Sequence, residues 1–123
     1  MTLRRALFLG CLSLFLYGMF RPAGPPGSLA PWDKELHFLA FAALTFTGRL
    51  AYPRVRWFFF WPLMLALAPF SEWLQDRLHR TRVFDTGDII ANLLGVFAGA
   101  VLLTAWWLLL RRVRRASARG SEE

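Results

Sequence analysis

Four long apolar runs, separated by charged or Pro/Gly-rich segments, dominate the hydrophobic pattern of this chain. They cover about residues 6–20, 36–52, 57–74 and 88–110. A helix needs about 17–25 apolar residues to cross the hydrocarbon core of a bilayer. The runs do not alternate with period two, and only helices or closed barrels satisfy the backbone in lipid. The sequence therefore predicts an all-α polytopic membrane protein, a bundle of four transmembrane helices forming one domain over residues 1–123.

The connections between the runs support this division. Residues 21–31 contain repeated prolines and glycines, so we expect this outer segment to be non-helical, with Pro31 in the first turn of the next helix. Residues 53–56 form a tight turn, and residues 77–87 a polar connection. Within the third run, Pro62 and Pro69 each remove an intrahelical hydrogen bond, which predicts a kink or a loosened turn just before Glu72.

The first run has two interpretations. Arg4 and Arg5 followed by an apolar stretch also have the charge order of a secretory signal. The nearest small-x-small cleavage motif is Ser28-Leu29-Ala30, and Pro31 directly after it would disfavour cleavage. We therefore expect the run to be retained as the first span, with its flanking arginines reaching out to the interface.

The composition indicates that lipid surrounds the chain, and it argues against several classes of function. Apolar residues make up 56% of the chain, too many for an ordinary soluble domain of 123 residues. A net charge of +7 would favour nucleic-acid binding in a soluble protein, but the apolar runs argue against a nucleic-acid partner here. Cys11 is the single cysteine, so the chain has no internal disulfide and no cysteine metal cage.

The basic residues predict the orientation, because cytoplasmic loops carry the Lys/Arg excess. With both termini inside, two thirds of the 15 Lys and Arg residues are cytoplasmic, including the basic tail 111–123. Six of the eight acidic residues then lie outside, all except Glu122 and Glu123. Mixed charge outside and arginine inside predicts a site on the outer face and anchoring on the inner face.

Polar residues recur at one depth on three of the four predicted helices. Asp33 and His37 are four residues apart, as are Asp88 and Asn92, so each pair shares a helix face. Each group alone could be a helix cap or an interfacial side chain. Because ionisable groups in lipid are costly, we instead expect them to converge in one pocket. The predicted pocket residues are Asp33, Lys34, His37, Glu72, Gln75, Arg82, Asp88 and Asn92.

Two glycines follow on the stripe that bears Asp88 and Asn92. Gly95 and Gly99 are spaced as in small-xxx-small helix contacts. We expect them to mediate close packing inside the bundle rather than dimerisation. Asp85 or Thr86, just before this helix, fits the role of its N-cap.

The combined pattern resembles the VanZ-like family of small bacterial membrane proteins. It comprises Asp33-Lys34-x-x-His37-x-x-x-Phe41, Glu72-x-x-Gln75, and a run from Arg82 through Asp85, Asp88, Asn92 and Gly95 to Gly99. The resemblance covers about residues 33–105. It implies four membrane helices in the bacterial cytoplasmic membrane and, through the family's namesake, a link to tolerance of the glycopeptide teicoplanin. It implies no established reaction.

Three functions remain open at this point. In the first, the outward pocket binds the head group of a membrane lipid or a lipid-linked cell-wall precursor, with Lys34 and Arg82 contacting phosphate or carboxylate. In the second, His37, Glu72 and Asp88 serve a phosphoryl- or acyl-transfer enzyme, although no nucleophile motif supports it. In the third, the polar groups merely pair within an assembly subunit. A metal centre on His37, Asp33, Glu72 and Asp88 is disfavoured by the single histidine, so we expect no metal and no cofactor.

Overall fold

The structure is a computed structural model that describes residues 2–22, 24, 27–80 and 83–119. Within these residues the chain has four α-helices, one short 3-10 helix and no strand. The α-helices are α1 (Leu3–Phe20), α2 (Asp33–Ala51), α3 (Trp57–Leu78) and α4 (Thr86–Arg119). The all-α, four-helix prediction is confirmed.

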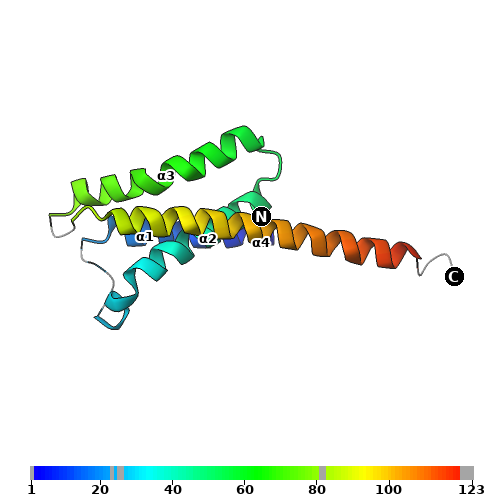
Figure 1. The fold of residues 1–123 in the computed structure, drawn as a ribbon, viewed down its shortest axis with the longest axis horizontal. Coiled ribbons are helices and arrows are strands. Elements are labelled where there is room, and N and C mark those ends of the chain that lie inside the picture. The colour runs from blue at the N-terminus through cyan, green and yellow to red at the C-terminus, as the bar shows by residue number, and fades with distance from the viewer. Residues whose placement is uncertain (1, 23, 25–26, 81–82, 120–123) are drawn as a thin grey trace.

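Successive helices run in opposite directions, and α2 lies between α1 and α4 (Figure 1). The most extensive interface is that between α2 and α4, followed by that between α1 and α2, whereas α3 packs mainly on α4. One end of the bundle therefore gathers the C-terminal ends of α1 and α3 and the N-terminal ends of α2 and α4 (Figure 1). We call it the polar end, because it carries the polar side chains described below.

Three of the described helices, α1, α3 and α4, are long and apolar enough to cross a membrane. The second, α2, has 19 residues and is one residue longer than α1, but Asp33, Lys34, Glu35 and Arg49 lie within it. The charged residues in its first turn are the reason that α2 is not among the three helices apolar enough to cross a membrane. That α2 also crosses the bilayer stays a prediction.

Two segments differ from the sequence-based boundaries. The prediction that residues 21–31 are non-helical was wrong at their end, because Gly27–Trp32 forms the 3-10 helix η1, which contains Pro31. A 3-10 turn needs few backbone hydrogen bonds, so a residue without an N–H is tolerated there. In addition, α4 continues well past residue 110 to Arg119 and extends beyond the other helices (Figure 1).

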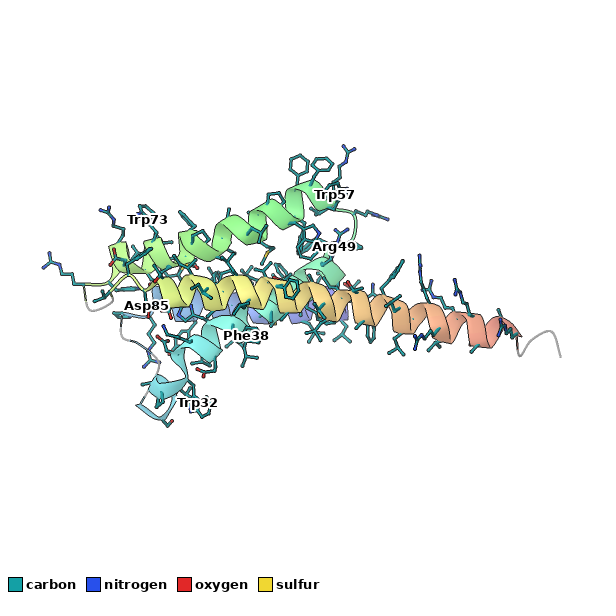
Figure 2. All side chains as sticks on the ribbon, viewed as in Figure 1. Trp32, Phe38, Arg49, Trp57, Trp73 and Asp85 are labelled. Atoms are coloured by element: carbon teal, nitrogen blue, oxygen red, sulfur yellow. The ribbon has the colours of Figure 1, made fainter. Side chains whose placement is uncertain are left out.

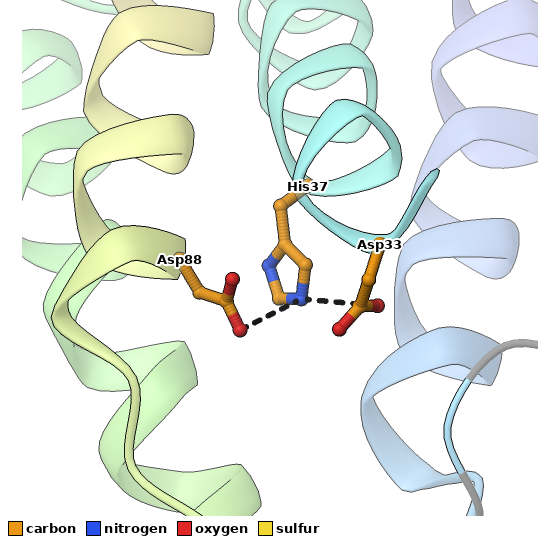
Figure 3. A group of neighbouring side chains, drawn as sticks. All are labelled: Asp33, His37 and Asp88. Carbon is orange, nitrogen blue, oxygen red and sulfur yellow. Dashed lines mark ion pairs between the residues drawn. The ribbon is translucent and has the colours of Figure 1, made fainter. Parts of the chain in front are cut away.

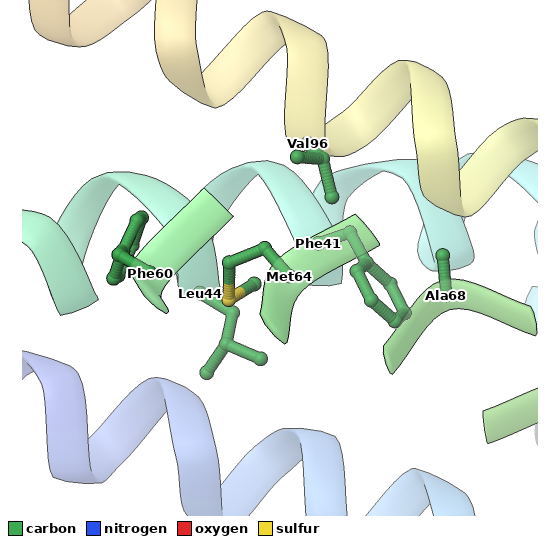
Figure 4. Packing of buried hydrophobic residues seen from close by; sticks show 6 residues of the cluster. All are labelled: Phe41, Leu44, Phe60, Met64, Ala68 and Val96. Carbon is green, nitrogen blue, oxygen red and sulfur yellow. The ribbon is translucent and has the colours of Figure 1, made fainter. Parts of the chain in front are cut away.

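The core lies where α2, α3 and α4 face one another, as Figure 4 shows. Its buried members are Phe41, Leu44, Phe60, Met64, Ala68 and Val96. Phe8, Leu12 and Phe15 of α1 pack against this cluster from the other side. Most remaining large apolar side chains point outward. An apolar exterior around a small interior is the arrangement expected of helices solvated by lipid.

Candidate functional site

Five of the predicted site residues lie together at the polar end of the bundle. Asp33, Lys34 and His37 come from the first two turns of α2, and Asp88 and Asn92 from the first two turns of α4. Carboxylates at a helix N-terminus are favoured by the helix dipole, which helps to hold Asp33 and Asp88 there. Figure 2 shows that this end, marked by Trp73 and Asp85, is opposite the end that carries Arg49 and Trp57.

Lys34 links the start of α2 to the start of α4. Its Nζ atom lies 2.5 Å from Oδ2 of Asp85 and 3.1 Å from Oδ1 of Asp88. The Asp88 side chain is only 8% exposed, whereas that of Lys34 is 55% exposed. The ammonium group therefore neutralises a buried carboxylate while still reaching the surface.

Asp85 both caps α4 and binds Lys34. Its Oδ1 atom accepts a hydrogen bond from the backbone N–H of Gly87, 2.7 Å away, so capping by Asp85 is confirmed. The hydrogen bond from Lys34, aided by the one from Gly87, lowers the pKa of the Asp85 carboxyl group below its ordinary value. The carboxylate form is thus the one that this loop stabilises.

Asn92 fixes the orientation and the tautomer of His37. The Asn92 side chain is fully buried, and its Nδ2 atom donates to the carbonyl oxygen of Ala68 at 3.3 Å and to Oγ of Ser71 at 3.4 Å. A carbonyl oxygen can only accept, so the amide nitrogen must face α3 and the amide oxygen must face His37. Nδ1 of His37 lies 3.0 Å from that oxygen and therefore carries a proton.

The other ring nitrogen of His37 points between two carboxylates, as Figure 3 shows. Nε2 lies 3.7 Å from Oδ2 of Asp88 and 3.9 Å from Oδ1 of Asp33. Both separations exceed the length of a hydrogen bond. Asp33, His37 and Asp88 each offer a ligand atom within 4.8 Å of the others, which makes them the group among the described residues that could hold a metal ion.

Two of the remaining predicted residues make their hydrogen bonds outside the group of Asp33, His37 and Asp88. Glu72 is buried on α3, and its Oε1 atom accepts a hydrogen bond from the backbone N–H of Asp85 at 2.9 Å. Gln75 turns toward α1, where its amide donates to the carbonyl oxygen of Gly18 at 3.2 Å. Glu72 and Gln75 thus tie α3 to the neighbouring segments. Arg82 lies outside the described residues.

Gly95 and Gly99 bring α4 against α2 one and two turns below Asn92. A Cβ atom on Gly95 would collide with the carbonyl oxygen of Phe38 and lie 2.9 Å from Cβ of Phe41. A Cβ atom on Gly99 would lie 2.8 Å from Cβ of Thr45. Only glycine permits this approach, and it sets the distance at which His37 meets Asn92 and Asp88.

A groove of about 520 Å³ opens beside the cluster, between α1 and α2. Its wall is mostly apolar and includes Leu14, Phe15, Leu36, Leu39 and Phe41, with Cys11 among them. Its polar lining includes Arg21, Asp33, His37, Ser71 and Gln75. The groove therefore joins a long apolar surface to the ionisable groups of the polar end.

Sequence reasoning missed several members of this region. Ser71 and Arg21 line the groove, and Asp85 pairs with Lys34 in addition to its role as a cap. The Ser71 hydroxyl donates to the carbonyl oxygen of Ala68 at 2.9 Å and accepts a hydrogen bond from the Asn92 amide at 3.4 Å, and nothing in the local sequence predicts this contact with α4. His79, which binds the carbonyl oxygen of Met19 at 3.1 Å, was also missed.

The described contacts of the cluster include no activated hydroxyl nucleophile. Ser71 is the hydroxyl nearest the cluster, but it is 3% exposed and donates its proton to a backbone carbonyl. No base is hydrogen-bonded to it to activate it among the described contacts. Charged groups beside an apolar groove instead offer contacts to an amphiphilic molecule.

Comparison of the chain with protein-family models, with curated proteins and with solved structures gave no match. The resemblance to the VanZ-like family consequently rests on the residues quoted above.

Proposed function

We propose that this chain is a multi-pass protein of the bacterial cytoplasmic membrane whose outward-facing end binds an anionic amphiphile. The ligand class is a membrane lipid or a lipid-linked cell-wall precursor, which share a phosphate group on an apolar chain. Binding of a cell-wall precursor would connect the chain with tolerance of teicoplanin, as the resemblance to VanZ-like proteins implies.

The observation that carries this proposal is the groove between α1 and α2. Its volume of about 520 Å³ falls within the range of ~300–1,000 Å³ typical of small-molecule sites. Apolar side chains form most of its wall, and Arg21, Asp33 and His37 lie along the same groove. An acyl or polyprenyl chain fits such a wall, and a polar head group fits its charged end.

Arg21 supplies the phosphate contact in this proposal. It lines the groove, and its guanidinium carbon lies 6.0 Å from the centre of the Tyr17 ring, so the side chain is packed at the edge of α1. A guanidinium group binds phosphate through two parallel hydrogen bonds. Lys34, which is half exposed, adds a second cation at the polar end, where it is paired with Asp85 and Asp88.

The outward orientation rests on the arginines at the opposite end. Arg49, Arg54 and Arg56 flank the connection between α2 and α3, and the second half of α4 carries five more arginines. By the positive-inside rule that end is cytoplasmic, so the polar end faces outward.

Native mass spectrometry of the detergent-purified chain tests the proposal. We expect the wild type to retain phosphatidylglycerol or a polyprenyl phosphate in preference to phosphatidylcholine, and the two anionic probes distinguish the two sources of phosphate. Gly18 lines the groove, and a Cβ atom there would meet nothing within 4 Å, so Gly18→Leu should fill the groove without distorting the helix.

Gly10→Leu is the matched control, because Gly10 is also on α1, its Cβ position is open and it is not a lining residue. Arg21→Gln should weaken retention of both anionic probes, whereas Arg77→Gln, at an exposed position of α3, should not. Equal retention by the wild type and Gly18→Leu would contradict the groove as the binding site. Retention of phosphatidylcholine as strong as that of the anionic probes would contradict the role of Arg21.

A further inference from the structure

We infer that Asp33, His37 and Asp88 form a binding site for one divalent transition-metal ion, of the Zn²⁺ type, at the edge of the groove. Metal binding by these side chains is separate from head-group binding, because it requires no lipid. Three features of the cluster support it: the direction of a histidine lone pair, the separations of the ligand atoms, and the charge of the side chains.

The lone pair follows from the hydrogen bonds of Asn92. Its amide nitrogen faces Ala68 and Ser71, so its oxygen faces Nδ1 of His37, which must donate. In the neutral imidazole Nε2 then bears the lone pair. In a histidine that binds metal through one ring nitrogen, the other ring nitrogen usually donates its proton to an acceptor in the protein. This hydrogen bond fixes the tautomer and the orientation of the ring.

The separations match ligands that share an ion. Nε2 of His37 lies 3.7 Å from Oδ2 of Asp88 and 3.9 Å from Oδ1 of Asp33. These distances are too long for hydrogen bonds, but two atoms that each lie about 2.0–2.5 Å from one ion are separated by similar distances. Asp33 and His37, four apart on α2, act as a chelating pair on one helix face, and α4 supplies the third ligand.

The charges also favour a cation between these groups. A lone pair aimed at two carboxylates is repulsive unless a proton or a metal ion lies between them. Asp33, Asp85 and Asp88 place three carboxylates here, whereas Lys34 is the single ammonium group that the described contacts bring to them. Lys34 binds the other oxygen of Asp88, so it leaves Oδ2 facing His37.

The nature of the ligands defines the metal. One imidazole nitrogen and two carboxylate oxygens suit zinc, manganese or iron better than calcium or magnesium. Three protein ligands leave at least one coordination position for an exchangeable ligand, as in zinc sites that bind substrate. Asp33 and His37 line the groove, so that position lies beside it. If the proposed function is right, a phosphate oxygen of the amphiphile is the fourth ligand.

Metal binding by the purified chain, without any added lipid, tests this inference. The protein is purified with a tag that lacks histidine, stripped with a chelator, and titrated with Zn²⁺ by calorimetry and with Co²⁺ by visible absorption. We expect one bound ion per chain and cobalt bands typical of nitrogen and oxygen ligands, which an equivalent of Zn²⁺ abolishes. Binding of less than half an equivalent by the wild type would overturn the inference.

Matched variants locate the site. Asp33→Asn, His37→Gln and Asp88→Asn should each weaken Zn²⁺ binding at least a hundredfold. Their controls, Glu35→Gln on the same turn of α2 and His79→Gln at the other histidine, should bind as the wild type does. Zinc affinities of the three site variants within threefold of the wild-type value would also overturn the inference.

Asn92 is a positioning residue, and its effect tests the tautomer argument. Asn92→Leu should weaken Zn²⁺ binding by about 10–100-fold and should alter the cobalt bands, because Nδ1 loses its acceptor. A cobalt spectrum unchanged from that of the wild type would contradict this role. Metal titration and lipid retention are measured separately, so failure of the metal site and failure of the proposed function can be told apart.

Discussion

Gly95→Ala is expected to separate α4 from α2 and so to destabilise the whole bundle. The added Cβ atom would meet the carbonyl oxygen of Phe38, Cβ of Phe41 at 2.9 Å and the backbone nitrogen of Ala42 at 3.1 Å. Two of these three atoms belong to the backbone of α2, which cannot rotate away. The helices must therefore move apart to restore normal contact distances.

The magnitude follows from two opposing effects. Alanine is favoured over glycine inside a helix by about 1 kcal/mol. Overpacking of a tight interface typically costs about 1–3 kcal/mol, and backbone contacts place this site at the upper end. We therefore expect Gly95→Ala to lower the free energy of unfolding by about 2 kcal/mol, which raises the unfolding equilibrium constant roughly thirtyfold.

The assay is reversible unfolding of the purified chain in mixed detergent micelles, followed by circular dichroism and by the fluorescence of its six tryptophans. Gly10→Ala is the control, because a Cβ atom there meets nothing within 4 Å, and it should be neutral or slightly stabilising. If Gly95→Ala proves as stable as Gly10→Ala, close approach of α2 and α4 at Gly95 is refuted. Zn²⁺ affinity should fall with stability, because Asn92 is one turn away on α4.

Three further outcomes are expected. Pairing with the Lys34 ammonium lowers the pKa of Asp85 in the folded state and so stabilises that state. This stabilisation is complete above the ordinary carboxyl pKa of about 4 and is lost as the pH falls through the lower pKa of the folded state. Lys34→Met should therefore flatten the acid dependence of the free energy of unfolding, and an unchanged profile would contradict the pairing. A cysteine at Ser28, in a chain with Cys11 replaced by serine, should react with an impermeant maleimide added to the outside of intact cells, and labelling only after lysis would reverse the topology. The double variant of His37→Gln and Asn92→Leu should be less destabilised than the sum of the single variants, because the two side chains share one hydrogen bond; additive losses would show that they act separately.

Much of the fold follows from the sequence alone. A helix satisfies its backbone hydrogen bonds within one segment, as an apolar run long enough to cross a bilayer requires. The four helices accordingly lie where the four apolar runs lie. Helix ends are less well determined. The tail after residue 110 is rich in arginine and alanine, which are strong helix formers, so α4 continues to Arg119 although its apolar run has ended.

Helical periodicity also determined which polar residues share a face. Asp33 with His37, and Asp88 with Asn92, follow directly from a spacing of four residues. Periodicity cannot indicate which neighbouring helix a face meets, however. The contact of Asn92 with His37 depends on the approach of α4 to α2 at Gly95, a relation between residues more than fifty positions apart.

The tertiary structure alone decided how the polar residues divide among partners. Gln75, three residues after Glu72, lines the groove with Asp33 and His37, but its amide donates to the carbonyl oxygen of Gly18 on α1. Likewise, the direction of the His37 lone pair depends on Asn92, whose own orientation is set by Ala68 of a third helix. Such hydrogen bonds depend on the relative placement of whole helices, which arises from the packing of many side chains and is encoded in no local spacing.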